Sequence, residues 1–143
     1  MEQAVQELFR QYQRFFMQAL AGQPDPAAIA RLYTPEFIAA SAAGVTTGKQ
    51  DADFMQAMAQ GYDYYRDIGT RDMQISAIRI SPIDPTHCIA HIGWQARYAR
   101  DDLPETVIAF DVHYLVQYLD GIARVFGWIT GDEQATLREN GVI

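Results

Sequence analysis

Cysteine, basic residues and long apolar runs are all scarce in this sequence. Cys88 is the only cysteine among 143 residues, so the chain cannot form an internal disulfide. Its 11 basic and 18 acidic residues give a net charge of −7, which argues against binding to nucleic acid or to an anionic membrane surface. Charged residues (Glu2, Glu7, Arg10, Arg14) interrupt the N-terminal apolar pattern, so it is not a signal peptide, and no apolar run could span a bilayer. We therefore expect a cytoplasmic, soluble protein.

The remaining composition is that of an ordinary globular domain. Hydrophobic residues make up 49 % of the chain and charged residues 20 %, a balance that supports a sizeable core rather than disorder. The sequence shows no internal repeat, low-complexity tract or linker. We expect a single domain over residues 1–143.

Helical periodicity dominates the first half of the chain. Apolar residues at spacings of three and four predict a helix over Gln3–Ala21, which Gly22 ends. A short helix is predicted over Ala27–Tyr33, and a third begins near Lys49 and ends at Gly69. The order of elements therefore places three helices ahead of most of the strands.

From Arg71 onward the period changes to two, which predicts strands. We expect four long ones, connected by tight turns such as Asp120-Gly121, and one short hairpin before the third helix. The short hairpin pairs Phe37–Ser41 with Val45–Thr47, and the long strands cover Met73–Ser81, Thr86–Arg100, Glu105–Leu119 and Ile122–Thr130. The tail over 132–140 suggests a helical turn. The predicted class is α+β, with a strongly curved antiparallel sheet covered by the helices.

Alternation along the long strands separates two faces of the sheet. One face is apolar and aromatic and should pack on the helices, whereas the other mixes polar residues with apolar ones such as Ile89, Val107 and Leu115. A half-apolar outer face indicates that something covers it, and a homodimer partner is the simplest candidate. A β-bulge in either strand would exchange the faces beyond it.

The succession of elements resembles the nuclear transport factor 2-like superfamily, with its SnoaL-like polyketide cyclases and ketosteroid isomerases. The resemblance covers nearly the whole chain and lies in the segments "ARLYTPEF", "TTGKQDADFMQAM" and "YLDGIARVFGW". It implies a cone of curved sheet capped by helices, a cavity between them, and often a dimer through the sheet. The superfamily holds enzymes, binding modules and assembly domains, so the fold alone assigns no function.

The resemblance also allows a test of isomerase chemistry. Ketosteroid isomerases use a carboxylate base, with a tyrosine and a protonated aspartate as the oxyanion hole. Matching the elements places Phe15 at the tyrosine, Ser41 at the base, and Val112 or Asp111 at the acid. Because two of these groups are replaced, isomerisation by that mechanism is not expected, and whether the chain is an enzyme stays open.

Two kinds of site remain candidates. The first is an aromatic pocket for a small apolar or aromatic molecule, with rings near the apex of the cone filling the core and rings near its mouth lining the cavity. The residues expected to line it are Phe15, Tyr33, Met58, Tyr62, Trp94, Tyr98, Phe110, Tyr114 and Trp128.

The second candidate is an acid–base pair of Asp111 and His113, which share a strand face at i and i+2, with His91 on the neighbouring strand. The alternative is that these groups lie on the outer face and bond to water or to a dimer partner, which the alternation favours. His87 and His91 are roughly 13 Å apart along one strand, too far to share one metal ion, and we expect no metal or other cofactor. A cavity protein that binds a small molecule is therefore the first hypothesis, and a SnoaL-like cyclase, dehydratase or isomerase using Asp111 and His113 is the alternative.

Overall fold

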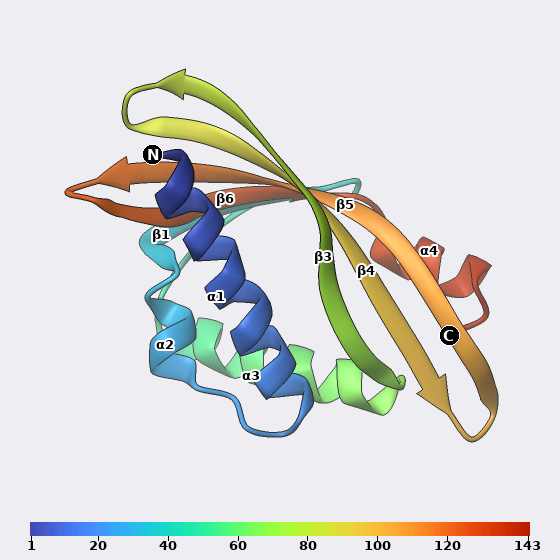
Figure 1. Cartoon of the computed structure of the whole chain (residues 1–143). Helices are drawn as coiled ribbons and strands as arrows, with labels where there is room; N and C mark the ends of the chain where they lie inside the picture. Colours follow the sequence, from blue (N-terminus) through green and yellow to red (C-terminus); the bar gives the residue numbers. More distant parts are fainter.

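A computed structural model describes all of residues 1–143 and shows a curved, unclosed six-stranded sheet with helices on its concave side (Figure 1). In chain order the elements are α1 (Glu2–Leu20), α2 (Pro26–Ala30), β1 (Tyr33–Ser41), β2 (Gly44–Lys49), α3 (Ala52–Asp67), β3 (Thr70–Asp84), β4 (His87–Arg100), β5 (Leu103–Leu119), β6 (Ile122–Thr130) and α4 (Glu133–Glu139). This confirms the predicted α+β class and the order of the elements. None of the helices combines the length and apolar character needed to cross a membrane.

Helix α1 is the main support of the sheet. Its apolar face buries Val5, Leu8 and Phe9 completely or nearly so in the main core, and Glu2 in its first turn complements the positive end of the helix dipole. The chain leaves the helix at Gly22, whose φ of +82° is readily adopted by glycine. In Figure 1 the helix lies across the hollow of the curved sheet.

Helix α2 is shorter than the sequence suggests. The Asp25 carboxylate accepts a hydrogen bond from the backbone N–H of Ala28 at 3.1 Å, and Pro26 occupies the first turn, as expected for a helix start. The helix ends at Ala30 because the chain joins the sheet almost at once: the Leu32 carbonyl accepts from the N–H of Val125 at 2.8 Å. Tyr33, predicted to be helical, therefore begins β1.

The sheet has the strand order β2-β1-β6-β5-β4-β3. All neighbouring strands are antiparallel except β1 and β6, which run parallel. The predicted antiparallel sheet is thus confirmed except for this pair, in which the chain returns to the side of β1 only after β2, α3 and three further strands.

The predicted division of β4 and β5 into an inner and an outer face holds along the ladder that joins these two strands. Strands β4 and β5 pair without a register shift from His87 to Tyr98. Bulges that exchange faces lie instead on the two flanking strands, on β6 at Phe126 and on β3 at Ser76, where two residues of the flanking strand span one step of its neighbour. Residues 88, 90, 92, 94, 96 and 98 of β4 are accordingly all buried.

Candidate functional site

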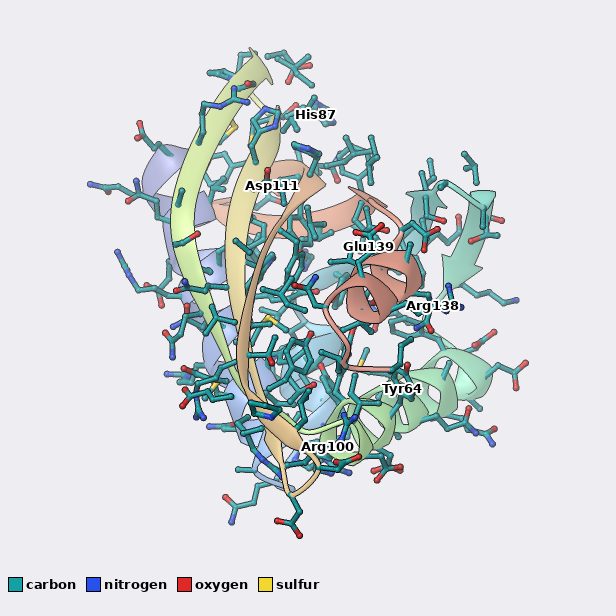
Figure 2. The ribbon with its side chains drawn as sticks, turned by 90° about the vertical axis from the view of Figure 1, so that its right-hand side faces the viewer. Tyr64, His87, Arg100, Asp111, Arg138 and Glu139 are labelled. Atoms are coloured by element: carbon teal, nitrogen blue, oxygen red, sulfur yellow. The ribbon has the colours of Figure 1, made fainter.

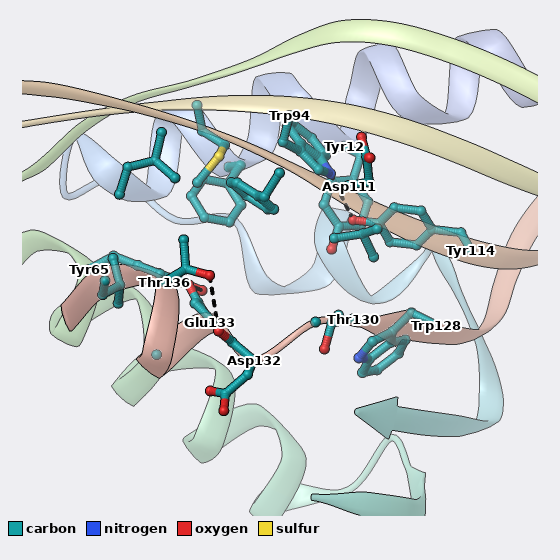
Figure 3. Close-up of a pocket in the computed structure, with 18 of the residues that line it drawn as sticks. Tyr12, Tyr65, Trp94, Asp111, Tyr114, Trp128, Thr130, Asp132, Glu133 and Thr136 are labelled. Carbon is teal, nitrogen blue, oxygen red and sulfur yellow. Dashed lines mark hydrogen bonds between the residues drawn. The ribbon is translucent and has the colours of Figure 1, made fainter. Parts of the chain in front are cut away.

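A cavity of about 510 Å³ lies between the concave side of the sheet and the helices. This volume falls in the range of small-molecule sites. Of the 22 residues that line it, 15 are hydrophobic, and they come from α1, α3, α4 and five of the six strands. Figure 3 shows Tyr12, Trp94 and Tyr114 on one side of this space and the α4 residues on the other.

Four polar groups of the aromatic wall are paired with one another. The Tyr33 hydroxyl donates to the Tyr12 hydroxyl at 2.9 Å, and the indole N–H of Trp94 donates to the Tyr114 hydroxyl at 3.1 Å (Figure 3). Rings of these residues also meet edge to face, with the centroids of Tyr12 and Tyr114 5.5 Å apart. The wall is therefore a packed aromatic assembly in which hydrogen bonds hold the hydroxyls of Tyr12, Tyr33 and Tyr114.

Burial keeps the phenols of this wall protonated. Desolvation raises the pKa of Tyr12, and it raises those of Tyr33 and Tyr114 well above the ordinary tyrosine value. The pKa of Tyr65 is raised as well, first by burial and then by the nearby Glu133 carboxylate. At neutral pH the cavity thus presents neutral hydroxyls that can donate or accept a hydrogen bond.

Helix α4 and the segment before it form one rim of the cavity. Asp132 caps the helix, because its carboxylate accepts from the Ala135 N–H at 3.0 Å. Glu133 accepts from the Tyr65 hydroxyl at 2.8 Å and so ties α4 to α3. No lysine, arginine or histidine lines the cavity.

Most of the residues expected to line a pocket meet in this cavity. Those that line it are Tyr33, Met58, Tyr62, Trp94, Tyr98, Phe110, Tyr114 and Trp128. Phe15 does not line it: its half-buried ring packs at the edge of the core, with the Arg14 guanidinium 5.0 Å from the ring centroid. Ser41, matched above to the isomerase base, is exposed at the β1–β2 turn, where its hydroxyl accepts from the Ala43 N–H at 3.2 Å.

Sequence reasoning missed several lining residues. Tyr12 and Phe16 replace Phe15 on α1, where they continue the face of the buried Phe9 three and seven residues further along, and how the helix docks on the sheet decides which apolar position faces the cavity. Nothing in the sequence indicates that α4 lines the cavity with Thr136 and Leu137, because the pattern of a seven-residue helix does not show against which part of the fold it packs.

The structure does not bring Asp111 and His113 together as a pair. Asp111 is exposed and borders the cavity just past the end of β6, and Figure 2 shows it well away from α3. His113 lies between the buried Val112 and Tyr114, so its side chain is on the outer face. There its Nδ1 lies 2.7 Å from Nδ1 of His91, and no hydrogen bond joins it to Asp111.

His91 has a second partner on the outer face. Its Nε2 lies 2.9 Å from the hydroxyl of Ser81 on β3. Burial, followed by the charges of Arg79 and His113, lowers the pKa of His91 below its ordinary value. Its imidazole is therefore the neutral form at pH 7, able to accept a proton on one nitrogen.

Comparison with solved structures supports the fold and no more, because all identities are low. An NTF-2 like protein of unknown function from Shewanella oneidensis MR-1 superposes with a TM-score of 0.67 at 13% identity, covering 92% of this chain and 98% of that one. A putative scytalone dehydratase from Novosphingobium aromaticivorans gives 0.65 at 14%, covering 90% and 80%. A ketosteroid isomerase-like protein from Erwinia carotovora atroseptica gives 0.62 at 14%, covering 90% and 92%.

A comparison with curated proteins found no match. A family model described as "NTF2-like protein (DUF6841)" matches residues 2–133, which is nearly the whole chain. The cone of curved sheet, the helices in its hollow and this match agree with one another, and the chain belongs to this NTF2-like family.

Proposed function

We propose that this protein binds a small, mostly apolar or aromatic molecule in the cavity of the cone. The observation that carries the proposal is the lining: an aromatic and aliphatic wall around about 510 Å³, with neutral hydroxyls at fixed positions. Such a site favours a flat apolar ligand with one or two polar groups that can bond to the hydroxyls. The absence of any cationic lining residue disfavours a carboxylate or phosphate ligand.

The two tryptophans make this proposal easy to test. Trp94 and Trp128 are the only tryptophans of the chain, and both line the cavity. A ligand that enters should change the intrinsic fluorescence and raise the thermal midpoint, since binding to the folded state alone stabilises it by about 2.7 kcal/mol at a concentration 100 times Kd. A panel of neutral aromatic and polyketide-like compounds that changes neither signal would contradict the proposal.

We extend the proposal to a homodimer through the outer sheet face. Ile38 and Ile129 are 41 % and 47 % exposed on β1 and β6, and the half-buried Leu115 of β5 lies on the same face, across Gly127 of β6 from Ile38. We call these three residues the outer patch. Its apolar side chains on three adjacent strands are what a second copy of the chain could cover.

A charge on the outer patch should separate such a dimer. Sedimentation should give a dimer for the wild type and a monomer for Ile129→Lys, because a lysine would be buried without a partner. Ile83→Lys is the matched control, since Ile83 is 63 % exposed at the β3–β4 hairpin, away from the patch. A wild-type monomer at high concentration would contradict the dimer without affecting the cavity.

Acid–base catalysis by Asp111 and His113 within the cavity is not part of the proposal. The His113 imidazole lies on the opposite side of β5 from the aromatic wall and bonds to His91. A ligand held between Tyr12 and Trp128 would be separated from that imidazole by the sheet itself.

A further inference from the structure

A chain of hydrogen bonds runs across three strands on the outer face of the sheet. It begins at Arg79 on the edge strand β3, where Nη1 lies 3.3 Å from the Ser81 hydroxyl. The hydroxyl lies 2.9 Å from Nε2 of His91 on β4, and Nδ1 of His91 lies 2.7 Å from Nδ1 of His113 on β5. The register supports the arrangement, because Arg79, His91 and His113 are directly opposed across the two ladders.

These bonds can run in the direction that activation of the hydroxyl requires. A guanidinium can only donate, so the Ser81 oxygen accepts from Arg79, and the hydroxyl can donate its own proton to Nε2 of His91 when that imidazole carries its hydrogen on Nδ1. A neutral His91 that accepts at Nε2 carries its hydrogen on Nδ1, which it donates to Nδ1 of His113. The network is then fully satisfied with one proton in each bond.

We propose that Ser81 is a nucleophile activated by His91, and that this face of the sheet transfers acyl groups from esters to water. The arrangement has the order of a hydroxyl nucleophile, an imidazole base within hydrogen-bond reach, and a third group that fixes the tautomer of the base. His113 would be a positioning residue, since it acts through His91. Arg79 would stabilise the negative charge that develops on the attacked oxygen.

The chemistry needs only an ester and water. The Ser81 oxygen bonds to the carbonyl carbon while its proton passes to Nε2 of His91, and the tetrahedral intermediate then expels the alkoxide, which takes that proton and leaves as the alcohol. A water molecule next attacks the acyl-serine, giving its proton to His91. Collapse releases the carboxylic acid and returns the proton to the serine oxygen.

The site is reachable and separate from both proposals above. Ser81 is half-buried on the edge strand, and Arg79 beside it is exposed. Three strand spacings, roughly 14 Å, separate β3 from β6, so a partner seated on Ile129 could cover His113 without covering Ser81. The cavity lies on the opposite side of the sheet, so a substitution that abolishes the function of one site should leave the other site intact.

A fluorophosphonate probe tests the nucleophile directly. Attack would form a Ser81 oxygen–phosphorus bond, break the phosphorus–fluorine bond and release fluoride, with the hydroxyl proton passing to His91. Mass spectrometry of the digested protein should find the adduct on Ser81 and not on Ser76, which is exposed on the same strand but bonds to no histidine. Labelling should vanish in Ser81→Ala and fall at least ~100-fold in His91→Gln.

Ester turnover provides a second readout with its own control. Free imidazoles hydrolyse activated esters such as p-nitrophenyl acetate without a serine, so His87→Ala serves as the matched surface histidine. The initial burst of p-nitrophenol should survive His87→Ala and be lost in Ser81→Ala. For His113→Ala, a positioning role predicts that the midpoint of the pH–rate profile of labelling shifts, whereas a purely structural role would lower the rate at every pH alike. An unlabelled Ser81, or a burst that persists in Ser81→Ala, would overturn the proposal.

Discussion

The hydrogen bond between Trp94 and Tyr114 gives a stability prediction that can be worked from the structure. Replacing Tyr114 by phenylalanine removes the hydroxyl that accepts the indole N–H at 3.1 Å and leaves the ring in place. Trp94 is only 2 % exposed and Tyr114 only 4 %, so bulk water does not reach the orphaned N–H. A buried donor without a partner costs about 1–3 kcal/mol.

The expected change in thermal midpoint follows from the size of the chain. The entropy of unfolding of a domain of this length makes 1 kcal/mol equal to about 3 °C. Tyr114→Phe should therefore melt about 3–10 °C below the wild type in a calorimetric scan.

Tyr118→Phe is the matched control for this change. Tyr118 lies on the same strand and is half-buried, but its hydroxyl has no hydrogen-bond partner in the structure. The free energy of unfolding of Tyr118→Phe should lie within about 0.5 kcal/mol of the wild-type value. Equal midpoints for the two variants would refute the reasoning that the wall of the cavity depends on paired polar groups.

Two further predictions concern the alkaline limit and the packing of the sheet. Burial, followed by the Glu133 carboxylate, raises the pKa of Tyr98 to about 12. Above pH ~10 the unfolded chain releases this proton and the folded chain does not, so the free energy of unfolding should fall between pH 10 and 12. In Tyr98→Phe the free energy of unfolding, measured by chemical denaturation at each pH, should fall less steeply with pH, by up to ~1.4 kcal/mol per pH unit. An unchanged slope would contradict the raised pKa of Tyr98. Gly127→Ala should destabilise, because a Cβ there would lie 3.0 Å from both the Ile38 carbonyl oxygen and Leu115 Cδ1, whereas Gly61→Ala in α3 meets nothing within 4 Å and should stabilise by about 0.5–1 kcal/mol. Chemical denaturation of both variants checks the pair, and a neutral Gly127→Ala would show that the outer patch is loosely packed.

The sequence predicted the periodic segments of helix and strand well, but it predicted the ends of those segments poorly. Alternation over β4 and β5 predicted their inner faces, because uninterrupted ladders preserve the period of two. Helix α2 and strand β1 were misjudged at Tyr33, where a tertiary bond from Val125 to Leu32 overrides local helical preference.

The candidate site could be predicted in part for the same reason. Trp94 and Tyr114 lie on the inner faces of strands whose period is plain, so they could be assigned to the cavity side. Contributions from α4 and the choice of Tyr12 over Phe15 depend on how the helices rotate and dock, which is decided by packing and not by period. The bond between Ser81 and His91 joins residues ten positions apart through the register of a hairpin, which the alternation of one strand cannot reveal.

Blocking the cavity tests the central claim most directly. Gly61 borders the cavity on α3, and a Cβ added there would meet no other atom within 4 Å, so Gly61→Phe should place a ring in the space a ligand would use. Ala59→Phe, on the exposed side of the same helix, is the matched control. For a neutral aromatic compound that changes the fluorescence of Trp94 and Trp128 in the wild type, titration should show that binding is retained in Ala59→Phe and lost in Gly61→Phe. Equal binding to all three proteins would place the ligand elsewhere and contradict the account of the cavity.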